Sequence, residues 1–469
     1  MYPSAINFGD TCFQTPIALP TNEDGSKFQT AARSSEDREF KFKEVTTTQY
    51  GELEALLGDE ANTIDSLVVN GPIDSNDFLT MVKATVFGHL TVINLAESEI
   101  KDNTVPECAF ALSYKSSTGG YMFYSSPLRR IILPESVEKI KKNAFCQTSN
   151  LKQINFPTSL RRIEDLAFYM SGIATDPLVL PEGLELIGEG AFQYCKNFQH
   201  IQLPSTLKEI RDCAFYQTAI TYLSLPEGLE KLGSQAFRGT QLEEIYFPNT
   251  NANLEDGVIQ FGDNYNLRKI YLGEGMTEIP TCFLERAYEL TEINIPHSVK
   301  TIRENVFDEC NSIKSLELPL GVIRIDHHGL ADMAGLEQLV LPASLRWLGT
   351  DCLRGLKSLK RLYCAAEEPP VYDSPYYDKP FTSTYDASNA PTVYIPKGTK
   401  EKYEKAKGWK FFTNFVEIDS SEFPATAIDR TAIMEAKNIE EALYDLTGRK
   451  VEDPQKGHIY ISKGKKVVF

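Results

Sequence analysis

A hydrophobic pattern of nearly constant length repeats along the middle of the chain. Each copy reads Leu-x-x-Ile-x-Leu-Pro, then Leu-x-x-Ile, then Ala-Phe, where x is mostly polar. The proline that ends the first segment, or the residue in its place, recurs every 22 to 25 residues, at Pro134, Pro157, Pro181, Pro204, Pro226, Pro248, Gly273, Pro296, Pro319, Pro342 and Cys364. A period kept this closely predicts a solenoid, in which stacked turns share one core.

The first segment of each turn is predicted to be a half-buried strand. In one copy, Ile154 and Phe156 fall on one face while Gln153 and Asn155 fall on the other, which is the period-two alternation of a strand. Pro157 ends the segment because proline has no amide hydrogen to donate to a ladder. Strands of successive turns are therefore expected to pair in parallel, about 4.8 Å apart.

The Ala-Phe step is expected to fill the interior of each turn with one small and one large side chain. Leu160 and Ile163, from the segment before it, are expected to point inward as well. The repeated phenylalanines are Phe145, Phe168, Phe192, Phe215, Phe237, Phe283 and Phe307. An ordinary β-sandwich is the alternative, but it needs turn signals about every 8–12 residues and gives no reason for one phenylalanine per repeat.

Segments outside the regular repeats are expected to cap or extend them, since the terminal repeats of a solenoid cover an open core. Short helices are predicted at 50–57, 77–86 and 400–409, and further strands at 64–69, 90–95 and 393–396. The predicted organisation is an N-terminal segment and cap (1–60), degenerate repeats with an insertion (61–127), regular repeats (128–364), a C-terminal cap (365–418), a linker (419–430) and a small β unit (431–469).

The repeat closely resembles the BspA-like, or Treponema pallidum-type, class of leucine-rich repeat. The resemblance rests on copies such as Leu-Pro-Glu-Gly-Leu-Glu-Leu-Ile-Gly-Glu-Gly-Ala-Phe-Gln-Tyr-Cys at 180–195 and its counterpart at 295–310. It implies an α/β leucine-rich-repeat fold that is mostly β, built as a right-handed solenoid. It also implies a secreted or surface-exposed bacterial protein, often an adhesin, without catalytic residues.

The last residues resemble a second family. Tyr-Asp-Leu-x-Gly-Arg at 444–449 and Gly-x-Ile-Tyr-Ile at 457–461 are similar to the C-terminal sorting domain of the type IX secretion system of Bacteroidetes. Here His458 precedes Ile459-Tyr460, and the chain ends at Phe469 without the terminal lysine frequent in that family. The resemblance implies export and surface attachment, and the alternative is an inert β-sandwich remnant.

Charge and hydropathy exclude several classes of partner. The formal net charge is −17, which argues against nucleic acid and anionic lipid, because both are bound through Lys and Arg. No run of 18 apolar residues occurs, so no membrane span is expected. The mean hydropathy of −0.28 is that of a soluble globular protein.

The nine cysteines are scattered along the chain without a Cys-x-x-Cys motif, which favours packing over a disulfide framework. Cys195, Cys282, Cys310 and Cys352 are expected to point inward. Residues 1–20 have neither the basic nor the apolar region of a signal peptide. Taken literally this indicates a cytoplasmic protein. The family resemblances instead favour an extracellular or cell-surface location, with the leader absent from this chain.

Candidate chemistry is sparse. No hydrolase, metalloprotease, phosphate-loop or dinucleotide motif occurs, so neither an enzyme nor a cofactor is predicted. No metal site is predicted either. The Asn-rich loop at 249–257 could hold calcium through its oxygens, but it lacks the ligand spacing of an EF-hand, and a plain polar turn is the alternative.

The outward positions of the strand ladder give the best functional signal. Tyr222, Tyr246 and Tyr271 come from consecutive turns and are flanked by His200, Glu244 and Lys269. These residues are predicted to form an aromatic and polar strip that binds a protein or glycan of a host or neighbouring cell, because tyrosine is enriched in binding surfaces. Tyrosine also suits strands in general. The alternatives are a structural or assembly component of the cell surface without a discrete ligand, and an enzyme on surface polysaccharide. The oligomeric state stays open.

Overall fold

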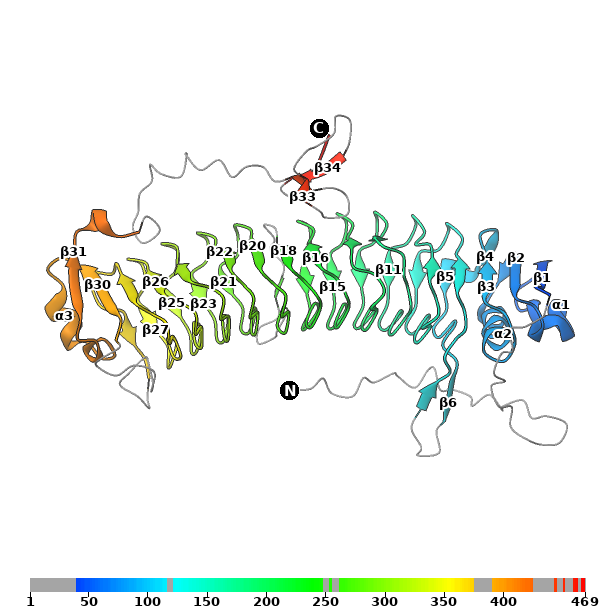
Figure 1. Cartoon of the computed structure of the whole chain (residues 1–469). Helices are drawn as coiled ribbons and strands as arrows, with labels where there is room; N and C mark the ends of the chain where they lie inside the picture. The colour runs from blue at the N-terminus through cyan, green and yellow to red at the C-terminus, as the bar shows by residue number, and fades with distance from the viewer. Residues whose placement is uncertain are drawn as a thin grey trace. The chain divides into compact units, whose positions relative to one another are not determined.

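The structure is a computed structural model that describes residues 39–115, 121–247, 253–254, 261–374, 390–424, 443–444, 450–451, 459–462 and 465–468. Parallel strand ladders form a leucine-rich-repeat solenoid of about 15 turns with roughly 23-residue spacing and few helices (Figure 1). The predicted mostly-β solenoid is therefore confirmed. Residues divide into two compact units, the first made of Met1–Phe198 with Glu209–Thr218 and the second of Gln199–Lys208 with Ala219–Phe469.

The first unit contains two parallel ladders. One pairs, in order, β1 (Phe42–Thr46), β2 (Ser66–Ile73), β3 (Val92–Asn94), β8 (Arg130–Ile132) and β10 (Gln153–Ile154), with β4 (Ser98–Ile100) also pairing with β2. The other pairs β5 (Thr104–Val105), β9 (Lys139–Ile140), β11 (Arg162–Ile163), β13 (Leu186–Ile187) and β15 (Glu209–Ile210). The remaining elements are β12 (Leu178–Val179), the antiparallel hairpin β6 (Ser113–Lys115) and β7 (Tyr121–Phe123), α1 (Leu53–Leu57), α2 (Ser75–Val86), and the 3-10 helices η2 (Gly58–Asn62) and η3 (Lys101–Asn103).

The repeated phenylalanines form a stack inside the first unit, as predicted. Ring centroids lie 5.1 Å apart between Phe145 and Phe168, 5.2 Å between Phe168 and Phe192, and 5.3 Å between Phe192 and Phe215. The rings are parallel within 8° and fully buried. The separation is close to the spacing of parallel strands, because each turn contributes one ring and the ladder sets the rise per turn.

The predicted helix at 77–86 is present as α2 and begins two residues earlier. Asp74 caps its first turn by accepting a hydrogen bond from Asn76 N at 2.9 Å. Phe78, Met81 and Val82 are buried, which is the inward face that the sequence predicts. The helix therefore covers the core of the degenerate N-terminal turns.

The second unit also contains two kinds of ladder. One ladder consists of the strands predicted from the first segment of each repeat, and its side of the solenoid is called the strand side. Its first sheet contains β16 (Tyr222–Ser224), β18 (Glu244–Phe247), β20 (Lys269–Leu272) and β22 (Glu292–Asn294). Its second sheet contains β24 (Ser315–Glu317), β26 (Gln338–Leu341), β28 (Arg361–Cys364), β30 (Thr392–Pro396) and β31 (Phe415–Ile418). The other ladder pairs β21 (Glu278–Ile279), β23 (Thr301–Ile302), β25 (Arg324–Ile325), β27 (Trp347–Leu348) and β29 (Val371–Tyr372). Three more strands are β14 (Ile201–Gln202), β17 (Lys231–Leu232) and β19 (Asn253–Leu254).

The strand-side ladder of the second unit is interrupted between β22 and β24. These strands belong to separate sheets, whereas β21, β23 and β25 pair without interruption on the other side of the same turns. Ile293 on β22 is consequently half-buried, although Ile270 and Leu316 at equivalent inward positions are buried. The interruption thus opens the core locally on the strand side.

The segment predicted to be the C-terminal cap, 365–418, contains a shorter helix than the sequence predicts. The structure has α3 (Lys400–Lys405) and a separate 3-10 helix, η4 (Trp409–Phe411), where the prediction places one helix at 400–409. The helix stops because Ala406 is extended and Gly408 has a φ of 82°, a value that favours glycine. The Tyr403 and Trp409 rings still pack together, with centroids 5.0 Å apart.

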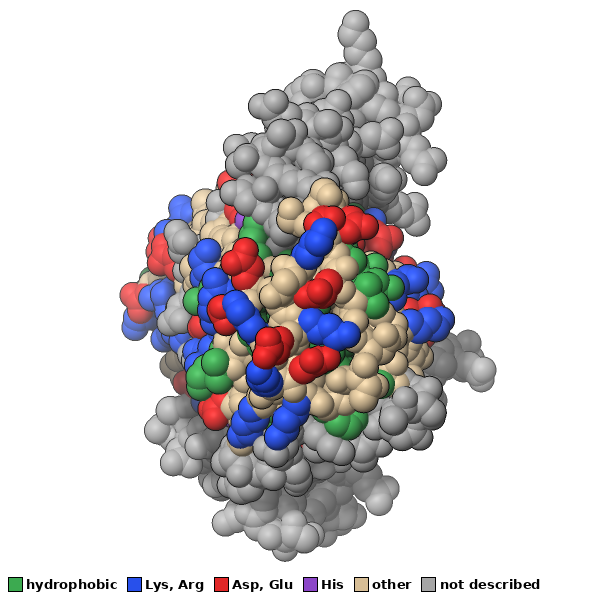
Figure 2. Space-filling view, turned by 90° about the vertical axis from the view of Figure 1, so that its left-hand side faces the viewer, with side chains coloured by type: hydrophobic (Ala, Val, Ile, Leu, Met, Phe, Trp, Pro, Cys, Tyr) green, Lys and Arg blue, Asp and Glu red, His purple; other side chains and the backbone are tan. Residues whose placement is uncertain are grey.

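Hydrogen bonds fix the cap to the last repeats. The Tyr403 hydroxyl donates to Ala366 O at 2.6 Å, and Trp409 Nε1 donates to Pro370 O at 2.9 Å. A 3-10 helix, η5 (Ser420–Glu422), leads to the buried Phe423. Figure 2 looks onto this end, where basic and acidic side chains are interspersed and hydrophobic ones form only small, separate areas.

Short strands at the C-terminus form an antiparallel sheet in the order β33 (Lys450–Val451), β32 (Leu443–Tyr444), β34 (Ile459–Ser462) and β35 (Lys465–Val468). Strands β34 and β35 pair from Ile459 with Val468 to Ser462 with Lys465. This antiparallel pairing differs from the parallel pairing of every repeat turn described here.

The cysteines match the predicted packing role only in part. Cys195, Cys310 and Cys352 are fully buried, but Cys282 is half-buried. Cys108 is disulfide-bonded, so at least one cysteine has a role other than packing. No Cys-x-x-Cys motif includes Cys108, so this bond could not be predicted from the sequence.

Candidate functional site

The predicted strip lies on the outward face of β14 to β22, in the second unit. Parallel pairing places Tyr222 beside Glu244, Glu244 beside Lys269, and Lys269 beside Glu292. A backbone hydrogen bond of 3.0 Å from Thr221 N to Gln199 O brings the turn that carries His200 next to the turn that carries Tyr222. These residues form the first outward column of the ladder.

A second outward column runs two residues further along each strand. Ser224 lies beside Tyr246, Tyr246 beside Tyr271, and Tyr271 beside Asn294. The three predicted tyrosines therefore divide between the columns, with Tyr246 and Tyr271 in register and Tyr222 in the first column. The aromatic part of the surface therefore consists of the paired Tyr246 and Tyr271, with Tyr222 diagonally adjacent to Tyr246.

All six predicted side chains are partly exposed. Burial raises the pKa of Tyr246, and the nearby negative charge of Glu227 raises it further. Partial burial between neighbouring strands holds such a ring in place while leaving part of its surface open to a ligand.

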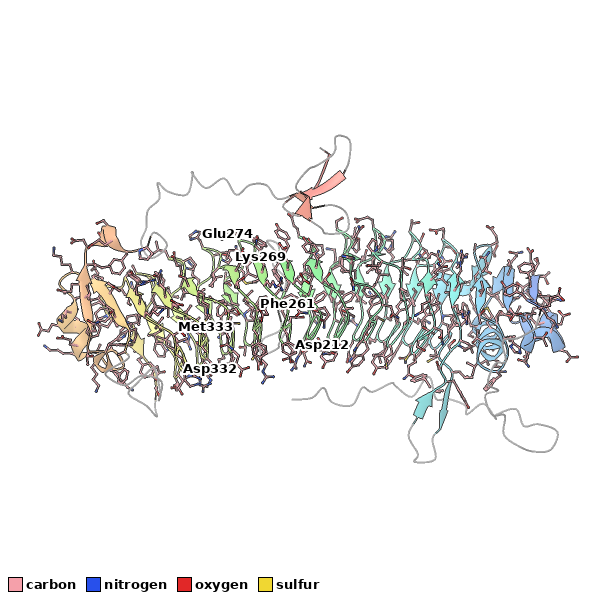
Figure 3. The ribbon with its side chains drawn as sticks, in the orientation of Figure 1. Asp212, Phe261, Lys269, Glu274, Asp332 and Met333 are labelled. Carbon is pink, nitrogen blue, oxygen red and sulfur yellow. The ribbon has the colours of Figure 1, made fainter. Side chains whose placement is uncertain are left out.

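Lys269 is the centre of the polar contacts on this face. Its Nζ lies 2.9 Å from Glu292 Oε2 and 5.1 Å from the centroid of the Tyr271 ring. Hydrogen bonds with Tyr271 and Glu292 raise the pKa of Lys269, so the ammonium stays protonated. Figure 3 shows Lys269 on the strand side, Asp332 on the opposite side, and Phe261 in the interior between them.

An open depression of about 370 Å³ adjoins Lys269 and Tyr271. Its other lining residues include Glu292, Asn294 and Ser315, so it lies over the interruption between β22 and β24. The depression is the place where the predicted strip offers a concave surface.

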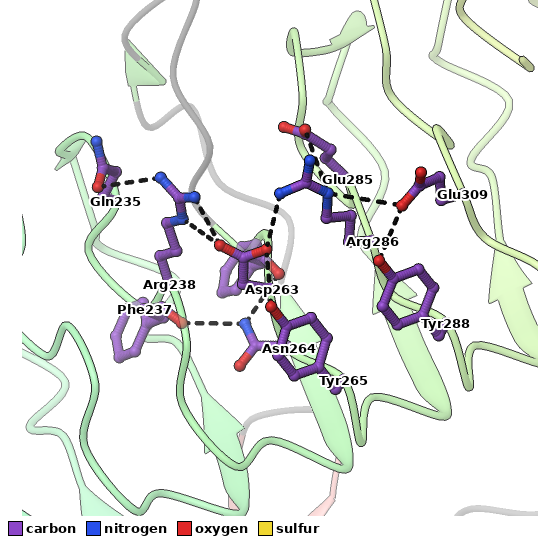
Figure 4. A network of polar contacts seen from close by, with 11 residues as sticks. Gln235, Phe237, Arg238, Asp263, Asn264, Tyr265, Glu285, Arg286, Tyr288 and Glu309 are labelled. Atoms are coloured by element: carbon purple, nitrogen blue, oxygen red, sulfur yellow. Dashed lines mark hydrogen bonds and ion pairs between the residues drawn. The ribbon is translucent and has the colours of Figure 1, made fainter. Parts of the chain in front are cut away.

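The structure brings together a second cluster, which the sequence analysis missed. The rings of Tyr265 and Tyr288 are stacked with centroids 5.5 Å apart and planes within 11° (Figure 4). The Tyr265 hydroxyl donates to Asp263 Oδ1 at 3.3 Å, and the Tyr288 hydroxyl donates to Glu309 Oε2 at 2.8 Å. A signal was present, because each tyrosine stands two residues before the leucine that opens the next strand segment.

Arginines complete this cluster. Arg238 Nη2 lies 2.6 Å from Asp263 Oδ2, and Arg286 Nη1 lies 3.6 Å from Asp263 Oδ1. Arg286 also lies 3.6 Å from Glu309. Since each arginine faces a carboxylate, the cluster links neighbouring turns.

Across the described ranges, no group of three His, Cys, Asp or Glu side chains could hold a metal ion. The Asn-rich loop proposed for calcium, 249–257, lies outside the described residues apart from 253–254. Within the same ranges, no helix has the length and hydropathy needed to cross a bilayer.

Comparisons with solved structures return several similar proteins. A leucine-rich repeat protein from Bacteroides ovatus is 22% identical to this chain, with a TM-score of 0.34. The match covers 58% of this chain and 86% of the Bacteroides ovatus chain. The pneumococcal vaccine antigen PcpA is 24% identical, with a TM-score of 0.43, and the match covers 69% of this chain and 85% of the PcpA chain. A leucine-rich cell surface protein from Faecalibacterium prausnitzii is 19% identical, with a TM-score of 0.32, and the match covers 67% of this chain and 80% of that protein's chain.

The comparison with families is more specific. No curated protein matches the chain. The family model for the BspA type leucine rich repeat region matches in six copies, over 115–176, 174–289 and 281–369. These matches span more than half of the 469 residues. The chain therefore belongs to the BspA-type leucine-rich repeat family.

Proposed function

We propose that the protein is a secreted or cell-surface binding protein, adhesin-like, whose strand-side face binds a protein or glycan of a host or neighbouring cell. The observation that carries this proposal is the partly exposed pair Tyr246 and Tyr271 in register, beside Lys269 and an open depression. Aromatic rings held by neighbouring strands supply contact area at low entropic cost. Leucine-rich repeat solenoids commonly use such long faces for binding.

Two further observations support a location outside the cytoplasm. Cys108 is disulfide-bonded, and disulfides persist mainly in oxidising environments such as the cell surface. The similar structures include one named as a vaccine antigen and one named as a cell surface protein. Export through the type IX pathway, with residues 431–469 as the sorting segment, forms part of the same proposal.

A binding screen with a matched variant tests the proposal. The wild-type chain and a Tyr222→Ala, Tyr246→Ala, Tyr271→Ala variant would be compared against extracellular-matrix proteins, mucins and glycans by surface plasmon resonance. The proposal expects at least one ligand whose binding is lost in the variant, while the melting temperature shows that the variant is folded. Binding that persists in the variant would exclude this face, and no binding to any ligand would exclude the function.

An assembly component of the cell surface is the second candidate, and one edge strand favours it. Among the strands of the described ranges, β1 lies at the end of its sheet, and Phe42 on it is 58% exposed. An edge strand with an exposed aromatic side chain is a surface on which a second chain can pair. Light scattering over a range of concentrations tests this role, since an assembly component would form oligomers that a Phe42→Lys variant does not form.

A further inference from the structure

The depression beside Lys269 exists because the strand-side ladder is interrupted. Strands β22 and β24 belong to different sheets, while the same turns remain paired in the ladder of β21, β23 and β25. The interruption leaves Ile293 partly exposed and creates a hollow of about 370 Å³ between Tyr271 and Ser315. The hollow is open to solvent, as a subsite for one unit of a chain-like ligand must be.

The residues that line the hollow combine an aromatic ring with hydrogen-bond donors and acceptors. Tyr271 supplies the ring, Lys269 supplies a donor, Glu292 supplies acceptors and Ser315 supplies a hydroxyl. Asn294 is not available to a ligand in the same way, because its amide bonds Leu272 N and Leu272 O, each at 2.8 Å. Its role is to hold the backbone that carries Tyr271.

The charges at the hollow favour an uncharged ligand. Lys269 and Glu292 neutralise each other at 2.9 Å, and Glu244 lies beside Lys269 on the preceding strand. An anionic ligand would meet the Glu292 carboxylate directly beside the Lys269 ammonium, in a chain whose net charge is −17. A neutral ligand with hydroxyl groups can instead accept from the ammonium and donate to the carboxylate without separating the ion pair.

These features match the surface of a sugar ring, which has an apolar C–H face and a rim of hydroxyl groups. C–H groups carry partial positive charge and pack well on the negative face of an aromatic ring. We propose that this hollow holds one sugar unit of a neutral glycan, packed against Tyr271 and hydrogen-bonded by Lys269, Glu292 and Ser315. The inference rests on the proposed function and names the ligand class of the same face.

The test uses the full chain on an array of neutral oligosaccharides with their sialylated and sulfated counterparts, followed by calorimetry with the best neutral ligand. Tyr271→Ala should weaken binding at least tenfold, because it removes the packing surface. Ser315→Phe should abolish binding by filling the hollow while removing no predicted contact apart from one hydroxyl. Glu317→Phe, on the same strand but outside the lining, and Tyr265→Ala should bind like the wild type.

The outcomes separate this inference from the proposed function. Selective binding of neutral glycans that is lost in Tyr271→Ala and Ser315→Phe supports the inference. Binding only to sialylated or sulfated glycans, or only to the matrix proteins and mucins run in parallel, overturns the inference and leaves the binding function in place. Neutral-glycan binding that both variants retain overturns the site. The absence of binding to every probe overturns the inference together with the function.

Discussion

Lys269 connects two features of the strand-side face, since its Nζ lies 2.9 Å from Glu292 Oε2 and 5.1 Å from the centroid of the Tyr271 ring. The contact with Tyr271 joins two residues of one strand, and the contact with Glu292 joins neighbouring strands. A cation over an aromatic face contributes about 0.5–1 kcal/mol at an exposed site. These contacts hold the Lys269 ammonium and the Tyr271 ring in place at the edge of the depression and contribute little to the stability of the fold.

Replacing Lys269 should therefore change binding more than stability. A Lys269→Met variant keeps the length of the side chain but loses the ammonium, and it is expected to weaken ligand binding while lowering the free energy of unfolding by no more than about 1 kcal/mol. Calorimetric binding and urea denaturation would measure the two effects. Lys360→Met is the control, because Lys360 has a similar ion pair, 2.8 Å from Glu337, away from the depression. Equal loss of binding in both variants would contradict the role of Lys269.

Removing Asp263 should destabilise the second unit. Its side chain is only 17% exposed and faces both Arg238 and Arg286, so Asp263→Ala leaves two guanidinium groups without their shared carboxylate. The expected loss is about 2–3 kcal/mol in the free energy of unfolding, because a poorly solvated charge loses its partner. Urea denaturation followed by circular dichroism measures the loss. Glu337→Ala, which removes the exposed partner of Lys360, should lower the free energy of unfolding clearly less than Asp263→Ala does. A similar loss of unfolding free energy in the two variants would show that the cluster in Figure 4 stabilises the fold no more than an exposed ion pair does.

The stability of the fold should depend on the protonation of Asp308. Burial, together with the charges of Asp332, Glu309 and Glu285, raises the pKa of Asp308 to about 6. A carboxyl whose pKa is raised on folding stabilises the folded state below its unfolded pKa, near 4, and this contribution is lost as the pH rises through 6.

The neutral variant Asp308→Asn should accordingly be more stable than the wild type at pH 8. The expected gain is about 1 kcal/mol, reduced from the full value of the shift because Asp308 is only half-buried. Near pH 4 the difference between the two proteins should disappear. Thermal melts of both proteins from pH 4 to pH 8 provide the measurement, and a difference that is independent of pH would show that Asp308 does not titrate in this range.

Thiol labelling checks the disulfide at Cys108. In denaturant without reductant, iodoacetamide should leave Cys108 unmodified. It should modify the cysteines that are not disulfide-bonded, which are Cys146, Cys195, Cys213, Cys282, Cys310, Cys352 and Cys364. Reduction should make Cys108 reactive and should lower the free energy of unfolding by about 2–4 kcal/mol. In the native protein Cys282 should react slowly at neutral pH, because burial raises its pKa to about 12. Peptide mass spectrometry resolves each site, and a labelled Cys108 before reduction would contradict the bond.

The repeat period determined the fold because it is a local signal that recurs in every turn. The spacing of the Leu-Pro stops set the length of a turn, and the alternation in one copy correctly placed Ile154 inside and Gln153 outside. The same alternation placed Val340 outside, but Val340 is buried in a cluster with Ala365 and Phe423. The same periodicity placed Phe168 and its counterparts in the core. Prediction became less accurate where single residues decide the outcome, as at the extended Ala406 and the positive-φ Gly408, which keep the helix from continuing to 409.

The details of the surface depended on tertiary structure. The sequence identified Tyr222, Tyr246 and Tyr271 as outward residues, but the pairing of strands decided that only the last two share a column. The interruption between β22 and β24, and the stacking of Tyr265 on Tyr288, arise from contacts between turns about 23 residues apart. The sequence by itself thus determined the repeating unit and its inward face, because those follow from residues close together in the chain. Only the tertiary structure decided which outward side chains meet, because their distances depend on how one turn is seated on the next.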